Sequence, residues 1–137
     1  MAEREGRPFL DTNVLLYLLS GDKARADRAE ALLARRGVVS VQVLNELASV
    51  ATRKLGLSWR DLGELLGAVR AGCTVQSLTE EVHDQARELA ERHRLSFYDA
   101  VIVSSALLAG CRVLYSEDMQ HGLNIERSLT IRNPFSP

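Results

Sequence analysis

The chain has 137 residues, a length typical of one compact domain, and 46% of them are hydrophobic, enough for a sizeable core. Its 17 Lys and Arg residues nearly balance 18 Asp and Glu residues, so no basic excess indicates nucleic-acid binding by itself. The N-terminal MAEREGRP is unlike a signal peptide, and no apolar run reaches membrane-spanning length. We therefore expect a single cytoplasmic domain over residues 1–137, with no membrane partner and with Cys73 and Cys111 reduced in the core.

Short apolar segments with the composition of buried strands alternate with helical patterns. In chain order, the predicted strands are PFL before Asp11, VVSV at 38–41, CTVQSL from residue 73, RVLYS from residue 112 and LTIR from residue 129. The predicted helices span 13–19, 23–35, 43–55, 59–71, 80–93 and 97–109, with Gly37, Gly72 and Gly110 as stop signals. This alternation predicts an α/β fold in which helices cover both faces of a parallel sheet.

The helix predicted at 97–109 reads FYDAVIVSSALLA and is apolar on nearly all sides. A helix of this kind is expected to lie buried against the sheet. Asp99 is its one charged residue, so this carboxylate requires an explanation.

Four carboxylates are expected at one edge of the sheet. In a parallel α/β sheet, the C-terminal ends of the strands and the N-terminal ends of the crossover helices share that edge. Asp11 and Asp118 follow predicted strands, Asp99 lies in a first helical turn, and we place Glu46 in the first turn of the helix at 43–55. Since residues so distant in sequence meet only in this topology, the four acids together predict one acidic site.

Carboxylates gathered in a cleft would repel one another and resist desolvation, and a divalent cation removes that cost. Ligand sets of oxygen atoms suit Mg²⁺ or Mn²⁺, whereas zinc would bring His or Cys ligands. His83, His93 and His121 lack the spacing of such ligands. Two ions about 4 Å apart could activate water and stabilise the leaving oxygen of a phosphodiester.

Each acid also has a structural interpretation that the sequence leaves open. Asp11 could cap the helix that DTN begins, and Asp99 ends SFYD, which has the pattern of a capping box. A glutamate on a helix, such as Glu46, is usually solvated. Glu117 also follows the fourth predicted strand; we prefer Asp118 for the site and leave the role of Glu117 open.

At these residues the sequence resembles the PIN-domain ribonucleases, most closely the VapC-type toxins of bacterial and archaeal toxin-antitoxin modules. The resemblance spans nearly the whole chain and rests on FLDTNVLLYLL, VLNELASV, LSFYDAVIVSSALLAGC and LYSEDMQHG, followed by LTIRNPF. It implies that the four acids are catalytic metal ligands and that Ser116 supports the site. Asn13 would orient a ligand or water, although turn formation explains this residue equally well.

The resemblance also implies a fold, a substrate and partners. The fold would have three layers, with a five-stranded parallel sheet in the order 3-2-1-4-5 between helices. The activity would be hydrolysis of RNA by an endoribonuclease that binds Mg²⁺ or Mn²⁺, with two ions present when substrate is bound. The partners would be a VapB-type antitoxin that covers the cleft and a second copy of the chain in a homodimer.

Other functions are compatible with parts of this pattern. A haloacid-dehalogenase-like phosphatase would need a second aspartate where the chain has Asn13, and a phosphoacceptor domain would need an aspartate ending the third strand, which CTVQSLT lacks. No GxxxxGK[ST] motif for a nucleotide-binding loop occurs. A PIN-like domain that binds RNA or a partner without cutting remains open, because intact acids do not guarantee turnover.

Overall fold

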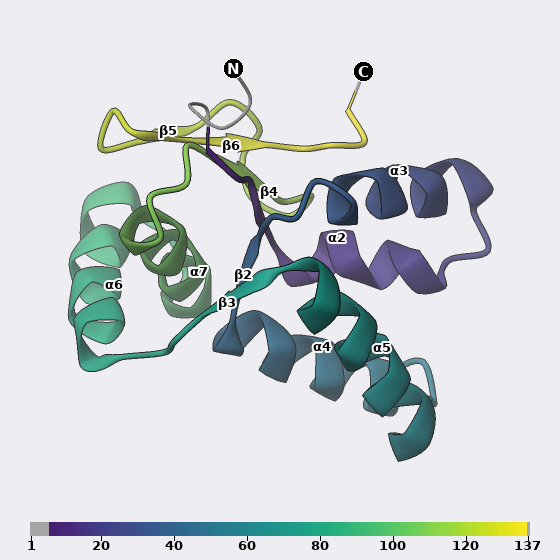
Figure 1. Cartoon of the computed structure of the whole chain (residues 1–137). Coiled ribbons are helices and arrows are strands. Elements are labelled where there is room, and N and C mark those ends of the chain that lie inside the picture. Colours follow the sequence, from purple (N-terminus) through teal and green to yellow (C-terminus); the bar gives the residue numbers. More distant parts are fainter. Residues whose placement is uncertain (1–5, 137) are drawn as a thin grey trace.

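The structure is a computed structural model, and it describes residues 6–136. Within this range, six short strands form one sheet (Figure 1). They are β1 (Phe9–Leu10), β2 (Val38–Ser40), β3 (Thr74–Gln76), β4 (Val113–Tyr115), β5 (Asn124–Ile125) and β6 (Leu129–Arg132). Their spatial order is β3-β2-β1-β4-β6-β5, and all neighbours are parallel except β5 and β6. The predicted parallel order 3-2-1-4-5 is confirmed, with β6 as its fifth strand.

The antiparallel strand β5 is an addition that the sequence did not predict. It pairs with β6 through a tight turn in which the Ser128 amide donates to the Ile125 carbonyl at 3.0 Å. The two central residues, Glu126 and Arg127, both have positive φ angles. Sequence patterns predict such turns from Asn or Gly at the two central positions, and neither residue occupies those positions in this chain. The Glu126 side chain instead pairs with Arg92 and His93.

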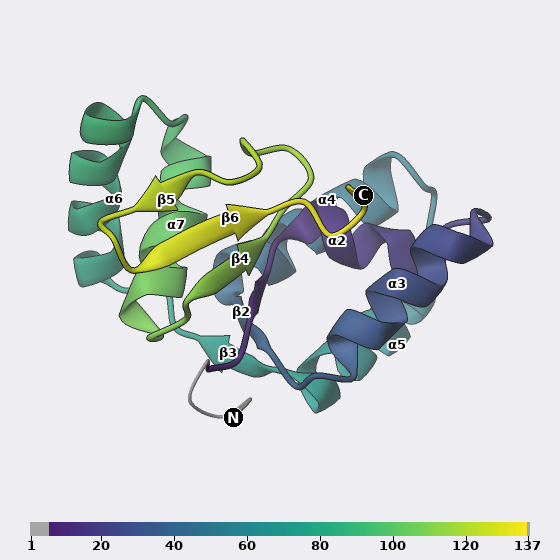
Figure 2. The same cartoon turned by 90° about the horizontal axis from the view of Figure 1, so that it is seen from above.

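Helices cover both faces of the sheet, as predicted. Figures 1 and 2 show α6 and α7 on one side and α2 to α5 on the other. The helical segments are α2 (Thr12–Leu16), η1 (Tyr17–Leu19), α3 (Lys23–Leu33), α4 (Val41–Arg53), α5 (Trp59–Gly72), α6 (Glu80–His93) and α7 (Phe97–Leu108). Residues 100–106 of α7 are all buried, which confirms the prediction for this apolar helix. None of the described helices is long and apolar enough to cross a membrane.

Two local predictions need correction. The helix α4 begins at Val41 rather than at residue 43, because Ser40 caps it by accepting a hydrogen bond from the Val43 amide at 3.2 Å. Glu46 therefore lies in the second turn of α4, not the first. Gly37 is not a stop signal for α3: a Cβ there would lie 2.4 Å from the Pro8 carbonyl oxygen, so the glycine permits close packing of two chain segments.

The expectations for Gly110 and Cys111 are confirmed, whereas Gly72 is the last residue of α5 and Cys73 is less buried than expected. Gly110 follows α7 with φ of +76°, a left-handed conformation that suits a helix end. Cys111 is buried, Cys73 is half-buried, and both thiols are free.

Candidate metal centre

Asp11 is at the centre of a hydrogen-bonded network at the end of β1. The residue is 4% exposed and is the N-cap of α2, where Oδ1 accepts a hydrogen bond from the Thr12 amide at 2.7 Å. Oδ2 accepts a hydrogen bond from Ser116 Oγ at 2.8 Å and a longer one from Asn13 Nδ2 at 3.3 Å. Capping therefore occupies one carboxylate oxygen, while the other contacts side chains that a cap does not require.

Asn13 links the loops that follow β1 and β4. Its Nδ2 lies 3.1 Å from Asp118 Oδ2 and 3.4 Å from Ser116 Oγ, and its Oδ1 accepts a hydrogen bond from the Glu117 amide at 2.9 Å. The loops meet because β1 and β4 pair in parallel and leave the sheet at the same edge. Asn13 and Ser116 thus lie in one network with Asp11 and Asp118.

Glu46 faces this network from α4. Its Oε1 accepts a hydrogen bond from Thr12 Oγ1 at 2.7 Å, and its Oε2 accepts one from Gln42 Nε2 at 3.2 Å. The side chain is half-buried rather than fully solvated. Sequence reasoning did not single out either partner: Thr12 reaches the glutamate only because α2 packs against α4, whereas Gln42 lies one turn before Glu46 on α4 itself. The position of Thr12 directly after Asp11 was the one available signal.

Asp99 lies in the first turn of α7 and is half-buried. Its amide donates a hydrogen bond to Ser96 Oγ at 3.3 Å, so the capping predicted from SFYD is present. Burial raises the pKa of the Asp99 carboxyl; hydrogen bonding with Ser96 lowers it, and the charges of Asp118 and Glu46 raise it. Asp99 therefore shares an electrostatic environment with two of the other acids although its amide takes part in the capping of α7 by Ser96.

Among the four acids, burial has its largest effect on the pKa of Asp11. Loss of hydration raises the pKa of this carboxyl to about 6. The hydrogen bonds from Ser116 and the Thr12 amide lower the pKa, and the charges of Glu46 and Asp99 raise it again. In the absence of a cation, the charged form of Asp11 is therefore held at a cost to the folded state.

Glu117 has a partner of its own. Its Oε2 accepts a hydrogen bond from Arg25 Nη1 at 2.7 Å, and its Oε1 accepts one from Tyr17 Oη at 2.8 Å. The Arg25 guanidinium also lies 5.1 Å from the centre of the Tyr17 ring. These contacts direct the Glu117 carboxylate to α3, whereas its neighbour Asp118 contacts Asn13. The geometry thus favours Asp118 over Glu117 as a member of the site.

The chemistry of the four acids fits a hard divalent cation. Among residues 6–136, no group of three or more His, Cys, Asp or Glu side chains is close enough to form a complete metal site. Glu46 and Asp118 are instead engaged by hydrogen bonds from Thr12 and Asn13. In the same range, none of the four acids forms an ion pair with Lys, Arg or His. Asp118 is exposed, whereas Asp11, Glu46 and Asp99 are buried or half-buried. Carboxylate oxygens without a basic counter-charge are the ligands that Mg²⁺ or Mn²⁺ prefers.

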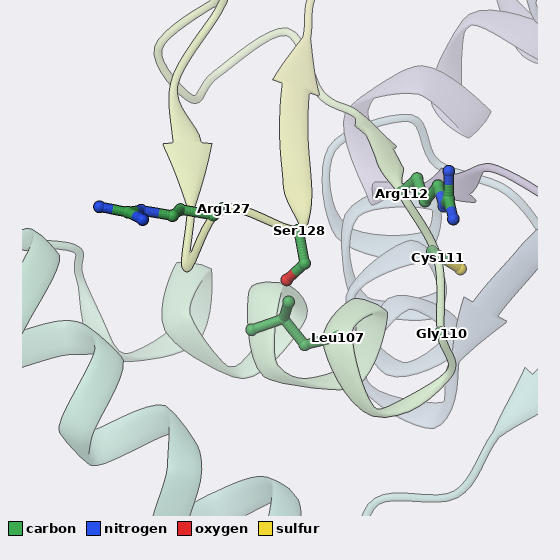
Figure 3. A pocket seen from close by; sticks show the side chains of 6 residues that line it. All are labelled: Leu107, Gly110, Cys111, Arg112, Arg127 and Ser128. Carbon is green, nitrogen blue, oxygen red and sulfur yellow. The ribbon is translucent and has the colours of Figure 1, made fainter. Parts of the chain in front are cut away.

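A separate cavity of about 440 Å³ lies at the opposite edge of the sheet (Figure 3). Its lining residues come from the end of α7 and the starts of β4 and β6, and they are Leu107, Gly110, Cys111, Arg112, Arg127 and Ser128. The side chains of Arg112 and Arg127 extend in different directions in Figure 3. The cavity has no carboxylate and does not belong to the acidic site.

The fold and the site define an α/β domain with an acidic centre at the carboxyl edge of a parallel sheet. The sequence profile of the PIN domain matches residues 9–122, and the chain belongs to the PIN domain family. This membership disfavours the phosphatase alternative. No curated protein sequence matches the chain significantly.

Solved structures show the same fold. A chain of a toxin-antitoxin complex from Klebsiella pneumoniae is 19% identical with a TM-score of 0.70, and the match covers 95% of this chain and 99% of that one. VapC20 from Mycobacterium tuberculosis, a toxin that cleaves the sarcin-ricin loop, is 26% identical with a TM-score of 0.65, and the match covers 81% of this chain and 89% of that one. A chain of VapBC2 from Rickettsia felis, solved with a promoter DNA fragment, is 19% identical with a TM-score of 0.64, covering 92% and 97%. The chain therefore has a VapC-like fold.

Proposed function

We propose that this chain is a metal-dependent endoribonuclease that hydrolyses phosphodiester bonds in RNA, and that it is the toxin of a type II toxin-antitoxin module. The observation that carries the proposal is the set of four carboxylates, Asp11 among them deeply buried, that have no basic counter-ion among residues 6–136. Membership of the PIN family and the likeness to VapC20, which is described as a toxin that cleaves the sarcin-ricin loop, support it.

The residues of the chain would have distinct roles. Asp11, Glu46, Asp99 and Asp118 would hold Mg²⁺ or Mn²⁺, with two ions when RNA is bound. When bound, these ions supply an activated water molecule and stabilise the charge on the scissile phosphate. Ser116 and Asn13 restrain the Asp11 carboxylate, and Thr12 restrains Glu46. Such restraint keeps ligands in place before substrate arrives, so less ordering is required on binding.

The test of this function is cleavage of single-stranded RNA with and without a divalent ion. We expect cleavage in Mg²⁺ or Mn²⁺, complete loss in excess EDTA, and recovery when Mn²⁺ is added beyond the chelator. Hydrolysis by activated water leaves 5′-phosphate and 3′-hydroxyl ends. Unchanged cleavage in EDTA, or products with cyclic 2′,3′-phosphates, would contradict the proposal. Binding of RNA without cleavage in any metal would favour the domain without turnover.

A groove beside the acids supports an antitoxin as the partner. A cavity of about 360 Å³ lies between the α2–η1 segment and the C-terminal half of α4. Its apolar lining includes Leu16, Leu19, Val50 and Leu55, and it also reaches Asn13 of the acidic network. Leu19 and Leu55 are exposed. An apolar helix in this groove could place a basic side chain against the carboxylates and substitute for the metal charge.

Replacing both exposed leucines by aspartate should weaken this partnership. We expect the Leu19→Asp/Leu55→Asp variant to cleave RNA as the wild type does and to lose inhibition by the VapB-type antitoxin that we propose as its partner. The charged side chains would be desolvated by an apolar helix, which typically costs at least tenfold in affinity. Equal inhibition of the variant and the wild type would contradict the assignment of the groove to the antitoxin.

We also propose that the chain forms a homodimer. Light scattering of the free chain would test this.

A further inference from the structure

Two arginines lie against the Tyr115 ring on the side of the sheet that faces α3, and a third lies on the neighbouring strand. The guanidinium carbons of Arg28 and Arg35 lie 6.0 Å and 5.9 Å from the ring centre, and Arg35 Nη1 donates a hydrogen bond to Tyr115 Oη at 3.1 Å. Arg132 of β6 is paired in register with Tyr115 of β4, so both side chains leave the same face of the sheet. We call Arg28, Arg35 and Arg132 the arginine face.

The positive charges of the arginine face are not neutralised. All three residues are exposed, and within residues 6–136 none of them forms an ion pair with a carboxylate. Arg28 donates from Nε to the Pro134 carbonyl at 3.1 Å. Contacts with an aromatic ring and a carbonyl restrict the guanidinium groups of Arg28 and Arg35 but leave most of their N–H donors free. A phosphate group is the ligand that such a donor set binds best.

The backbones of β4 and β6 connect the arginine face to the candidate metal centre. Tyr115 directly precedes Ser116, and the Ser116 amide donates to the Arg132 carbonyl at 2.9 Å. Figure 2 shows that the chain after β6 runs toward the side of the molecule where α2 and α3 lie. Arg28 lies in α3 and Arg35 lies in the turn just after the last residue of α3, Leu33, so this helix and its following turn carry both guanidinium groups to the Tyr115 ring.

Electrostatics explains why a nuclease would need this surface. The acidic centre repels a polyanion, and the net charge of the chain is −1, so long-range attraction does not come from the molecule as a whole. Neutralised pairs such as Arg25 with Glu117 contribute little to attraction. Unpaired arginines beside the acids supply a local positive surface that the overall composition conceals.

We propose that the arginine face binds the phosphate backbone of single-stranded RNA next to the scissile bond. The inference rests on the proposed function for the identity of the substrate. It assigns Arg28, Arg35 and Arg132 to substrate affinity and leaves the chemical step to the acids. Contacts with phosphates carry no sequence information, so the binding is independent of RNA sequence.

The test compares Arg28→Gln/Arg35→Gln with Arg60→Gln/Arg87→Gln, a matched control that removes two exposed arginines from α5 and α6. Binding of a labelled single-stranded RNA is measured by fluorescence anisotropy in EDTA over a range of salt concentrations, so cleavage does not interfere. We expect roughly tenfold weaker binding at low salt and a slope of log K against log salt reduced by about 1.4, since each phosphate contact contributes about 0.7. In Mn²⁺, the same variant should raise KM far more than it lowers kcat.

Two further variants guard against a misleading result. Arg28→Lys/Arg35→Lys keeps both charges and should retain most of the salt slope. Arg132→Gln removes a side chain that makes no hydrogen bond or ion pair among the described residues, so it should weaken RNA binding without affecting the fold, as a thermal melt can verify. Equal RNA affinity for the arginine-face and control variants would overturn the inference. A changed oligomeric state with unchanged RNA affinity would also overturn it, because the surface would then be a protein contact.

The binding experiment separates this inference from the proposed function. If the wild type cleaves RNA but the salt slope is the same in all variants, the arginine face is not an RNA surface and the nuclease assignment stands. If the wild type does not cleave in any metal but the slope falls as expected, the nuclease assignment fails and the RNA surface stands.

Discussion

Replacing Asp11 by asparagine should reduce RNA cleavage about a thousandfold or more. The substitution removes a buried negative charge that we assign to the metal ions, and a contribution of several kcal/mol from bound ions corresponds to this loss of rate. The change preserves the shape of the side chain, which occupies a site that is 4% exposed. Cleavage is measured at saturating Mn²⁺, so that weaker metal binding and slower chemistry can be separated by titration.

The same variant should behave in the opposite way in a stability measurement without metal. The folded pKa of Asp11 is about 6, above the ordinary value of 3.8. Because the pKa is higher in the folded chain, deprotonation of Asp11 destabilises the folded state. The free energy of unfolding is therefore highest at low pH and falls as the pH rises from about 4 to about 6. The full effect is roughly 3 kcal/mol. In EDTA, Asp11→Asn should therefore gain stability relative to the wild type as the pH rises through this window.

Asp84→Asn is the matched control, because Asp84 is an exposed aspartate of α6 that forms no ion pair among the described residues. It makes the same change in net charge and should leave cleavage and the pH dependence of stability unchanged. If Asp11→Asn cleaves RNA within tenfold of the wild type, Asp11 is not a metal ligand. A difference in stability that does not vary with pH would show that burial does not perturb this carboxyl.

Asp99→Asn should reverse the order of stability of the two proteins when metal is added. Without metal, the substitution relieves repulsion from Asp118 and Glu46, so the variant should melt at the wild-type temperature or above it. With free Mn²⁺ a hundredfold above its dissociation constant, the wild type should gain about 2.7 kcal/mol, and a variant with weaker affinity should gain less. Thermal melts of both proteins in EDTA and in Mn²⁺ measure this crossing.

Asp61 offers a close control for the helix-capping role of Asp99. Its amide donates to Ser58 Oγ at 3.1 Å in the first turn of α5, the same arrangement as Asp99 with Ser96, but it is exposed. Asp61→Asn should cost roughly 0.5 to 1 kcal/mol whether or not metal is present, as expected for a lost charge-dipole interaction. If Asp99→Asn follows this pattern instead of crossing, Asp99 is a capping residue and not a ligand.

The sequence by itself predicted the chain order of the helices and of every strand except β5, and the edge of the sheet at which Asp11 and Asp118 lie. Hydrophobic periodicity predicts the elements because it records which face each one buries, as the apolar helix α7 shows. The parallel topology then brings the residues after β1 and β4 to one edge, which is why Asp11 and Asp118 could be grouped although they are 107 positions apart in the sequence.

Only the tertiary structure decided which side chains contact each acid. The hydroxyl of Thr12 reaches Glu46 because α2 packs against α4. Glu117 forms an ion pair with Arg25, rather than contacting the other acids, because α3 lies beside the loop after β4. The arginines beside Tyr115 are likewise brought together by α3 and β6. Such contacts depend on the direction and packing of individual side chains from distant segments, and local patterns in a sequence carry no information about either.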